Sequence, residues 1–286
     1  MKRTKTRECG MLFEVNHMNS KVKDSVESYA KKAVLFTAEQ TPFAQDLFFT
    51  ALQGSQNYNL DNESSDIDTI SLMVPSFEQL VLDINVAKKT HSINYSEGIS
   101  TIKDFRSVFR TFIKGAVNVY QILYTPYVSV NEKYRKHFDY LRSMADDITS
   151  NNQRSIIYST LGVIRSNLAS ITRVGERILS SDELGKRFAM SFYYREFIER
   201  FMDGESFGSA MVTQNADYLK RLKRWKVDSL LYSIDDMEKW ADDFADRYSL
   251  LDGNELRLQE LQEELDKLSL EIMEGKDYDN QLSRNC

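Results

Sequence analysis

Two aspartates separated by one residue are the feature of the chain that most directly suggests chemistry. Asp66 and Asp68 open the segment DIDTISLMV, whose β-branched residues and following Pro75 predict a strand. Side chains two positions apart on a strand project from the same face, so both carboxylates can meet one cation. Hard divalent ions take oxygen ligands, commonly one or two carboxylates together with substrate phosphates. The pair therefore predicts a magnesium or manganese site that holds a nucleoside triphosphate.

A Gly-Ser pair lies shortly before these aspartates. Gly54 and Ser55 follow LFFTALQ (Leu47 to Gln53), an apolar and aromatic run that predicts a buried strand. A glycine lets backbone N–H groups approach a phosphate, and the serine hydroxyl adds a donor. Taken separately, Gly-Ser is a common turn and Asp-x-Asp a solvated strand end. Their joint placement favours a nucleotide-binding site.

The segment that contains both motifs resembles a known family. GSQNYNLDNESSDIDT (Gly54 to Thr69) is similar to the Gly-Ser, Tyr, Leu, Ser-Asp-x-Asp signature of the DNA polymerase beta-like nucleotidyltransferase superfamily. More narrowly, it resembles the predicted nucleotidyltransferases of bacteria and phages, with Tyr58, Leu60 and Ser65 extending the match and Asn59 where glycine is common. Fainter likenesses in KDFRSVFRTFIKGAVNVYQILYTPYV and GKRFAMSFYYREFIERFMDGES bring the coverage to about half the chain.

The resemblance implies a fold, a reaction and a set of residues. The fold would be α+β, a mixed sheet with helices followed by an all-helical C-terminal domain. Asp66 and Asp68 would bind magnesium, Gly54 and Ser55 would hold the triphosphate, and Lys186 matches a basic position suited to contacting triphosphate or acceptor. The reaction would move a nucleoside monophosphate to an acceptor hydroxyl. A protein side chain, an RNA end and a small molecule all stay open as acceptors.

The third carboxylate of the superfamily has no clear counterpart. Relatives usually carry it on the strand before the Lys-Asp-x-Arg segment, where this chain has Thr101. Asp104 is the nearest catalytic candidate, with Glu97 behind it, although Asp104 equally suits the N-cap of a helix. The helical region has Met190 and Tyr193 where relatives often have His and Arg. These departures motivate a rival hypothesis, a catalytically degenerate protein that acts as a binding or regulatory module.

Hydrophobic spacing predicts the surrounding elements. An amphipathic helix is expected over Val22 to Ala38, and a second helix begins at Asp104. Strands are expected only up to Pro126, which divides the chain into a nucleotidyltransferase-like domain, 1–126, and a helical domain, 127–286. Polar breaks should interrupt these helices at TSNNQ (149–153), SSDELG (180–185) and DGESFG (203–208). Leucines spaced by three and four from Leu258 to Ile272 predict a coiled-coil-like helix too short to indicate a dimer.

Composition limits the function classes. The net charge of −6 opposes general coating of nucleic acid, and the run YLKRLKRWK (218–226) is more often a solvated helix face than a nucleic-acid contact. Cys9 and Cys286 form no disulfide framework, and the three histidines have no partner at metal-site spacing. No apolar window is long enough for a membrane span and no signal peptide is recognisable, so we expect a soluble cytoplasmic protein.

Overall fold

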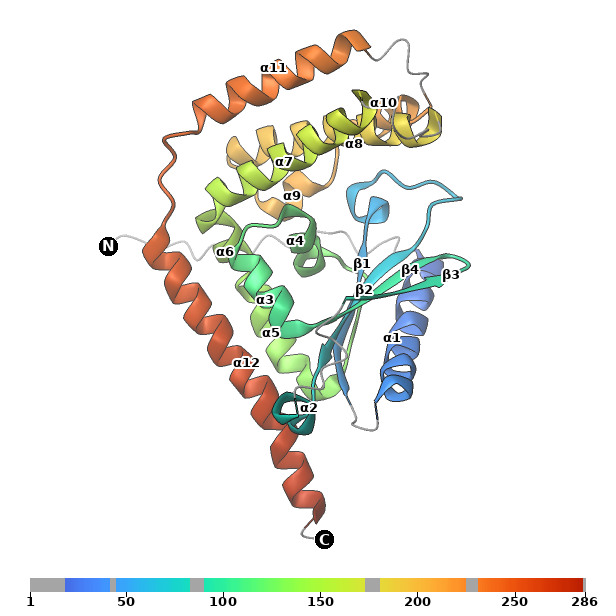
Figure 1. Cartoon of the computed structure of the whole chain (residues 1–286), viewed down its shortest axis with the longest axis vertical. Coiled ribbons are helices and arrows are strands. Elements are labelled where there is room, and N and C mark those ends of the chain that lie inside the picture. The colour runs from blue at the N-terminus through green and yellow to red at the C-terminus, as the bar shows by residue number, and fades with distance from the viewer. Residues whose placement is uncertain (1–18, 42–44, 83–89, 173–180, 225–230, 285–286) are drawn as a thin grey trace, which may run out of the picture.

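The computed structural model of the chain describes residues 19–41, 45–82, 90–172, 181–224 and 231–284 (Figure 1). Its single five-stranded sheet has the strand order β3-β4-β2-β1-β5. The strands are β1 Asp46–Gln53, β2 Asp68–Val74, β3 His91–Tyr95, β4 Gly98–Asp104 and β5 Val128–Val130. β2 and β4 are parallel, and the other three pairs are antiparallel. The expected mixed sheet with helices is confirmed.

Helices cover both faces of the sheet unequally. α1 (Ser20–Gln40) lies alone against one face, while the later helices gather on the other face and extend beyond it (Figure 1). Those near the sheet are α2 Phe77–Val81, α3 Phe105–Ile113, α4 Val117–Tyr124, α5 Arg135–Ser143 and α6 Ala145–Asn151. The remainder are α7 Gln153–Thr172, α8 Ser181–Met202, α9 Phe207–Met211, α10 Ala216–Leu222, α11 Leu231–Arg247 and α12 Glu255–Arg284.

The inner strand β1 is mostly apolar and is buried over its six central residues, because both of its faces are covered. Its register against β2 shifts between Leu47 and Phe49, and the bulge turns two consecutive aromatic rings toward the helices. Phe48 meets Phe105 of α3 edge-to-face, and Phe49 meets Phe138 of α5. These contacts anchor the helical side of the molecule to the sheet.

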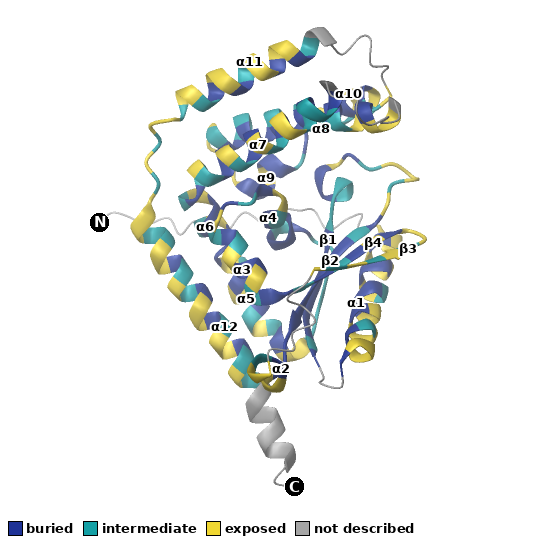
Figure 2. Cartoon of the chain, viewed as in Figure 1, coloured by how far each residue is buried: buried dark blue, intermediate teal, exposed yellow. Residues whose placement is uncertain are grey.

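One hydrophobic core continues from the sheet through the helical region to α12 (Figure 2). The expectation that strands end at Pro126 is wrong, because β5 follows it and pairs with β1. β5 spans only three half-buried residues, too few to produce a recognisable alternating pattern. The sheet therefore extends past the proposed boundary, and the helices that follow share its core.

Most expected elements are present, with two differences. α1 and β1 match their predicted ranges, and the breaks around Asn152 and after Met202 are confirmed. The break at 180–185 is wrong in its described part, because Asp182 to Gly185 lie inside α8. A Cβ on Gly185 would come within 2.5 Å of the Lys223 carbonyl oxygen, so this glycine serves close packing of α8 against α10. The β3–β4 hairpin is the other difference, and only β4 was implied, through the resemblance.

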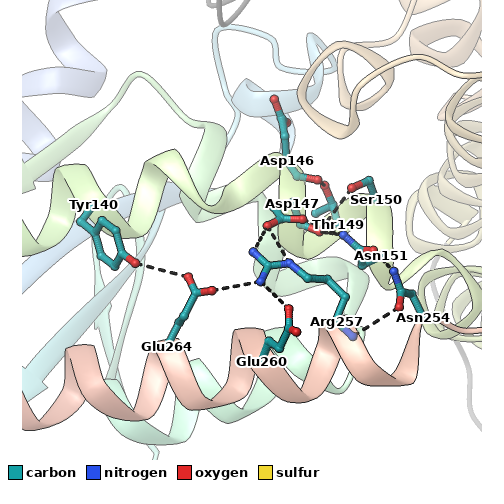
Figure 3. Close-up of polar contacts among 10 residues, drawn as sticks. All are labelled: Tyr140, Asp146, Asp147, Thr149, Ser150, Asn151, Asn254, Arg257, Glu260 and Glu264. Atoms are coloured by element: carbon teal, nitrogen blue, oxygen red, sulfur yellow. Dashed lines mark hydrogen bonds and ion pairs between the residues drawn. The ribbon is translucent and has the colours of Figure 1, made fainter.

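α12 packs against α3, α5 and α6 within the same chain. Its buried apolar positions are Leu261, Leu265, Leu268 and Ile272, with Leu258 partly buried. At its start, Arg257 binds Asp147 of α6 together with Glu260 and Glu264 (Figure 3). The leucine repeat of α12 is thus used in an intramolecular contact.

Candidate functional site

The Gly-Ser turn and Asp68 meet at one end of the sheet. Gln53, the last residue of β1, pairs with Asp68, the first residue of β2. Gly54 follows with φ +97°, a conformation that favours glycine, and leads into the 3-10 helix η2, Ser55–Tyr58. A Cβ on Gly54 would lie 3.9 Å from Asp68 Oδ2. The start of the Gly-Ser turn therefore lies beside the Asp68 carboxylate, and Ser55 is the next residue.

Asp68 faces the helical side of the sheet. Ile67, between Asp66 and Asp68, packs beneath α1 with Tyr29, and its N–H donates to the Glu97 carbonyl oxygen over 2.6 Å. Because successive side chains alternate along β2, Asp68 projects from the same face as Ile70 and Leu72, which belong to the core on the helical side. Asp68 is half-buried in β2, whereas Asp66 is exposed and precedes the strand. The common face expected for Asp66 and Asp68 stays a prediction, because only Asp68 belongs to the regular strand.

The carboxylate oxygens of Asp66 and Asp68 accept few hydrogen bonds from the described residues. Asp68 Oδ1 accepts the Ile99 N–H at 3.0 Å, and the Asp66 side chain forms no hydrogen bond with the described residues. Two carboxylates with free lone pairs suit a magnesium ion that completes its shell with phosphate and water. Within the ranges that the structure describes, no group of three or more His, Cys, Asp or Glu residues is placed to hold a metal. The donor set fits a two-carboxylate magnesium site.

The side chain of Gln121 on α4 holds the Gly-Ser turn in place through two hydrogen bonds. Its buried Oε1 accepts the Gly54 N–H at 2.8 Å and the Asn57 Nδ2 at 3.1 Å. The Gly54 N–H is therefore already bonded to the protein. The Ser55 hydroxyl forms no hydrogen bond with the described residues, so it is the donor of this turn that can meet a phosphate. No sequence motif marks Gln121; only its position among the apolar residues of a mostly apolar helix, VNVYQILY, could have drawn attention to it.

Replacement of Gln121 by alanine should loosen this turn. The Gln121→Ala variant leaves a buried N–H without an acceptor, so we expect the free energy of unfolding to fall by about 1–3 kcal/mol. Urea denaturation followed by circular dichroism measures the change, with the exposed Gln259→Ala on α12 as the matched control. A Gln121→Ala loss no larger than that of the control would contradict the anchoring role.

The two candidates for a third acid lie elsewhere. Asp104 pairs with Met73, five residues along β2 from Asp68, or about 16 Å at 3.3 Å per residue. Its carboxylate caps α3 by accepting the Arg106 N–H and binds the Arg106 guanidinium. Glu97 lies at the correct end, but its side chain turns toward α1, where it contacts Ser25 and Lys21. The structure brings neither carboxylate to the Asp66–Asp68 face.

The adjacent strand shows which residues replace an acid. Ser100 binds Thr69 and Ile102 packs beneath α1, so the alternate positions of β4 share the face of Asp68. These positions are Ile99, Thr101 and Lys103. Thr101 pairs with Ile70, one alternation beyond Asp68. The position that the resemblance assigns to the acid is thus on the expected face and carries a hydroxyl.

No protein-family model matches the chain, and no curated protein matches it either. The family resemblance therefore rests on the motif residues of the sequence.

Basic residues of the helical region reach the loop that follows the Gly-Ser turn. Lys223, just after α10, donates from Nζ to the Leu60 carbonyl oxygen at 2.7 Å. Burial, with the nearby charges of Lys186 and Lys220, lowers the pKa of Lys223, and Asp61 opposes the shift. Lys186, predicted as a phosphate contact, is exposed and lies beside this ammonium group. The local electrostatic field favours an anion.

Buried tyrosines support the turn on its helical side. Tyr193, the position where relatives often have Arg, packs its ring 4.6 Å from that of Tyr58 and donates its hydroxyl to the Met211 carbonyl oxygen. Burial raises the pKa of both phenols. Met190 is half-buried and packs against the core. Both departures from the family pattern thus have packing roles.

Tyr29, on α1, is a buried tyrosine whose pKa responds to the carboxylates at this end of the sheet. Its buried hydroxyl has no hydrogen-bond partner among the described residues. The pKa of this phenol is raised, chiefly by burial and next by the charge of Glu97. Asp68 and Asp66 make smaller contributions in the same direction. The carboxylates of Glu97, Asp68 and Asp66 therefore lie close enough to act on the Tyr29 phenol.

The remaining sequence candidates do not join the site. His91 lies in β3 beside Phe36. His137, on α5, contacts the preceding Tyr134. His17, Cys9 and Cys286 lie outside the described residues. No helix among the described segments has the length and apolarity needed to cross a membrane.

Proposed function

We propose that the protein is a magnesium-dependent nucleotidyltransferase whose nucleotide site is formed by Asp66, Asp68 and Ser55. The single observation that carries the proposal is the convergence of Asp68 with the Gly54–Ser55 turn, where Asp68 Oδ2 lies 3.9 Å from the position of a Gly54 Cβ. Carboxylates hold the cation and the turn meets the phosphates. A bound magnesium ion would neutralise phosphate charge.

The transfer step exchanges one phosphorus–oxygen bond for another. The acceptor hydroxyl oxygen forms a bond to the α-phosphorus, the bond from that phosphorus to the bridging oxygen breaks, and pyrophosphate leaves. The hydroxyl proton passes to water in this proposal, since the described β4 positions on this face carry no carboxylate. Catalysis is then mainly positioning and charge neutralisation.

A transfer assay tests the proposal. The protein is incubated with magnesium and each nucleoside triphosphate labelled at the α-phosphate, and both pyrophosphate release and covalent label on added acceptors are followed. We expect release with at least one nucleotide, dependent on magnesium and lost in Asp68→Asn. Absence of release with all four nucleotides, in protein shown to be folded, would reject a catalytic role.

A second candidate function is a binding or regulatory module that has kept the nucleotide site without turnover. The observation that favours it is the face of β4 that Asp68 shares, where Ile99, Thr101 and Lys103 provide no carboxylate. This candidate shares magnesium-dependent triphosphate binding with the enzyme. It differs by predicting no pyrophosphate release.

A further inference from the structure

Five cationic side chains gather where α8 begins and α10 ends. This basic cluster consists of Lys186, Lys220, Arg221, Lys223 and Arg224. None of them forms an ion pair within the described part of the chain, although the protein has a net charge of −6. Asp61 acts on Lys223 as an opposing charge, but among the described residues the five cations have no ion-pair partner of their own. Gathered like charges raise the electrostatic energy, which an anionic ligand would relieve.

The fold holds the basic cluster at the edge of the proposed nucleotide site. The close approach of Gly185 to the Lys223 carbonyl brings Lys186 and Lys223 together. Lys223 Nζ then binds the Leu60 carbonyl oxygen, and the Leu60 N–H binds the Ser55 carbonyl oxygen at 2.9 Å. On the other side of the same turn, Gln56 Nε2 donates to the Asp66 carbonyl oxygen. One short turn thus separates the basic cluster from the carboxylate pair.

An exposed aromatic ring accompanies the cations. Tyr218 of α10 is 41% exposed, and its ring rests edge-to-face against Phe192 of α8 with centroids 6.2 Å apart. Tyr218 precedes Arg221 by three residues, so the ring and the guanidinium lie on one face of the helix. Cations that contact a phosphate backbone, together with a fixed ring on which a base stacks, are the usual components of single-strand nucleic-acid sites.

We propose that the basic cluster and Tyr218 bind the end of a single-stranded nucleic acid and present its terminal hydroxyl as the acceptor. This inference rests on the proposed function for the role of that hydroxyl, whereas binding of the strand is independent of it. The cations would contact successive phosphates, and Tyr218 would stack on one base. The hydroxyl then takes the nucleophile's place in the step described above.

Strand binding is measured directly by fluorescence anisotropy. Labelled single-stranded RNA and DNA of about 12 nucleotides are titrated with the full chain, without nucleotide or magnesium, between about 50 and 200 mM salt. The test variant is Lys186→Gln/Lys220→Gln/Arg224→Gln, which leaves the Lys223–Leu60 contact in place. The salt slope is the change in the logarithm of the binding constant with the logarithm of salt concentration. Three lost phosphate contacts lower its magnitude by about 2. Between the two salt concentrations, the wild type should therefore lose on the order of 20-fold more affinity than the variant loses.

Two further variants sharpen the test. Tyr218→Ala should weaken binding about tenfold with little change in salt slope, because it removes a base stack. Lys267→Gln on α12 makes the same charge change as each lysine substitution on an exposed site away from the cluster, and should bind as the wild type does. Equal affinities and slopes for the triple variant and Lys267→Gln would overturn the proposal.

The outcomes separate this inference from the proposed function. Retained strand binding in Asp66→Asn/Asp68→Asn, with or without pyrophosphate release by the wild type, supports the strand site by itself. Loss of triphosphate binding in the triple variant, with strand binding unchanged, would overturn it, because the cluster would then serve the nucleotide alone.

Discussion

Asp66→Asn/Asp68→Asn is expected to lose magnesium-dependent triphosphate binding. Asparagine keeps the shape of each side chain and removes the negative charge that a hard cation requires. Substitutions in the residues that merely support a metal ligand cost about 10- to 100-fold in metal affinity, so removal of two direct ligands should exceed about 100-fold. Isothermal titration calorimetry with a non-hydrolysable triphosphate, with and without magnesium, measures the loss.

Asp104→Asn is the matched control for this double variant. Asparagine is also a good N-cap, so the start of α3 should be retained while the charge that pairs with Arg106 is removed. Because Asp104 lies about 16 Å along the strands from Asp68, we expect triphosphate binding to be unchanged. Equal losses of binding in the double variant and in Asp104→Asn would contradict the location of the site at the Gly54 end of the sheet.

Local patterns predicted the elements that carry Gly54 and Asp68 but did not predict what surrounds them. β1, β2 and α1 have strong apolar patterns because each buries a continuous surface. β5 is too short for a pattern, and β3 alternates between half-buried and exposed residues. Periodicity depends on burial, so these edge strands were the elements most easily missed.

The site itself was predicted where its residues are close in sequence. The Gly54–Ser55 turn and Asp68 lie at the two ends of the connection between β1 and β2, and antiparallel pairing of these strands brings them together. Gln121 and Lys223 come from distant helices, and no local pattern specifies that they contact Gly54 and Leu60. Asp104 illustrates the converse. It is close to Thr101 in sequence, yet three residues along a strand carry it about 10 Å toward the far end of the sheet.

One substitution at Thr101 tests whether a missing carboxylate limits catalysis. Thr101 pairs with Ile70 and shares the face of Asp68, about 7 Å farther along the strands. A carboxylate at this position could accept the proton of the attacking hydroxyl. A positioned general base contributes about 10²- to 10⁴-fold to a reaction rate. We therefore expect Thr101→Asp to raise magnesium-dependent pyrophosphate release by about 100-fold.

Thr101→Asn distinguishes proton transfer from a change of shape. It has nearly the same size as Thr101→Asp but cannot act as a base near neutral pH, so its pyrophosphate release should stay at the wild-type level. Single-turnover rates with water as the acceptor separate the chemical step from acceptor binding. If both variants bind triphosphate normally and release pyrophosphate at the wild-type rate, a missing acid at Thr101 does not limit turnover. If only Thr101→Asp accelerates it, the Asp66–Asp68 face already holds the nucleotide in a reactive geometry, and the proton acceptor is what the native site lacks.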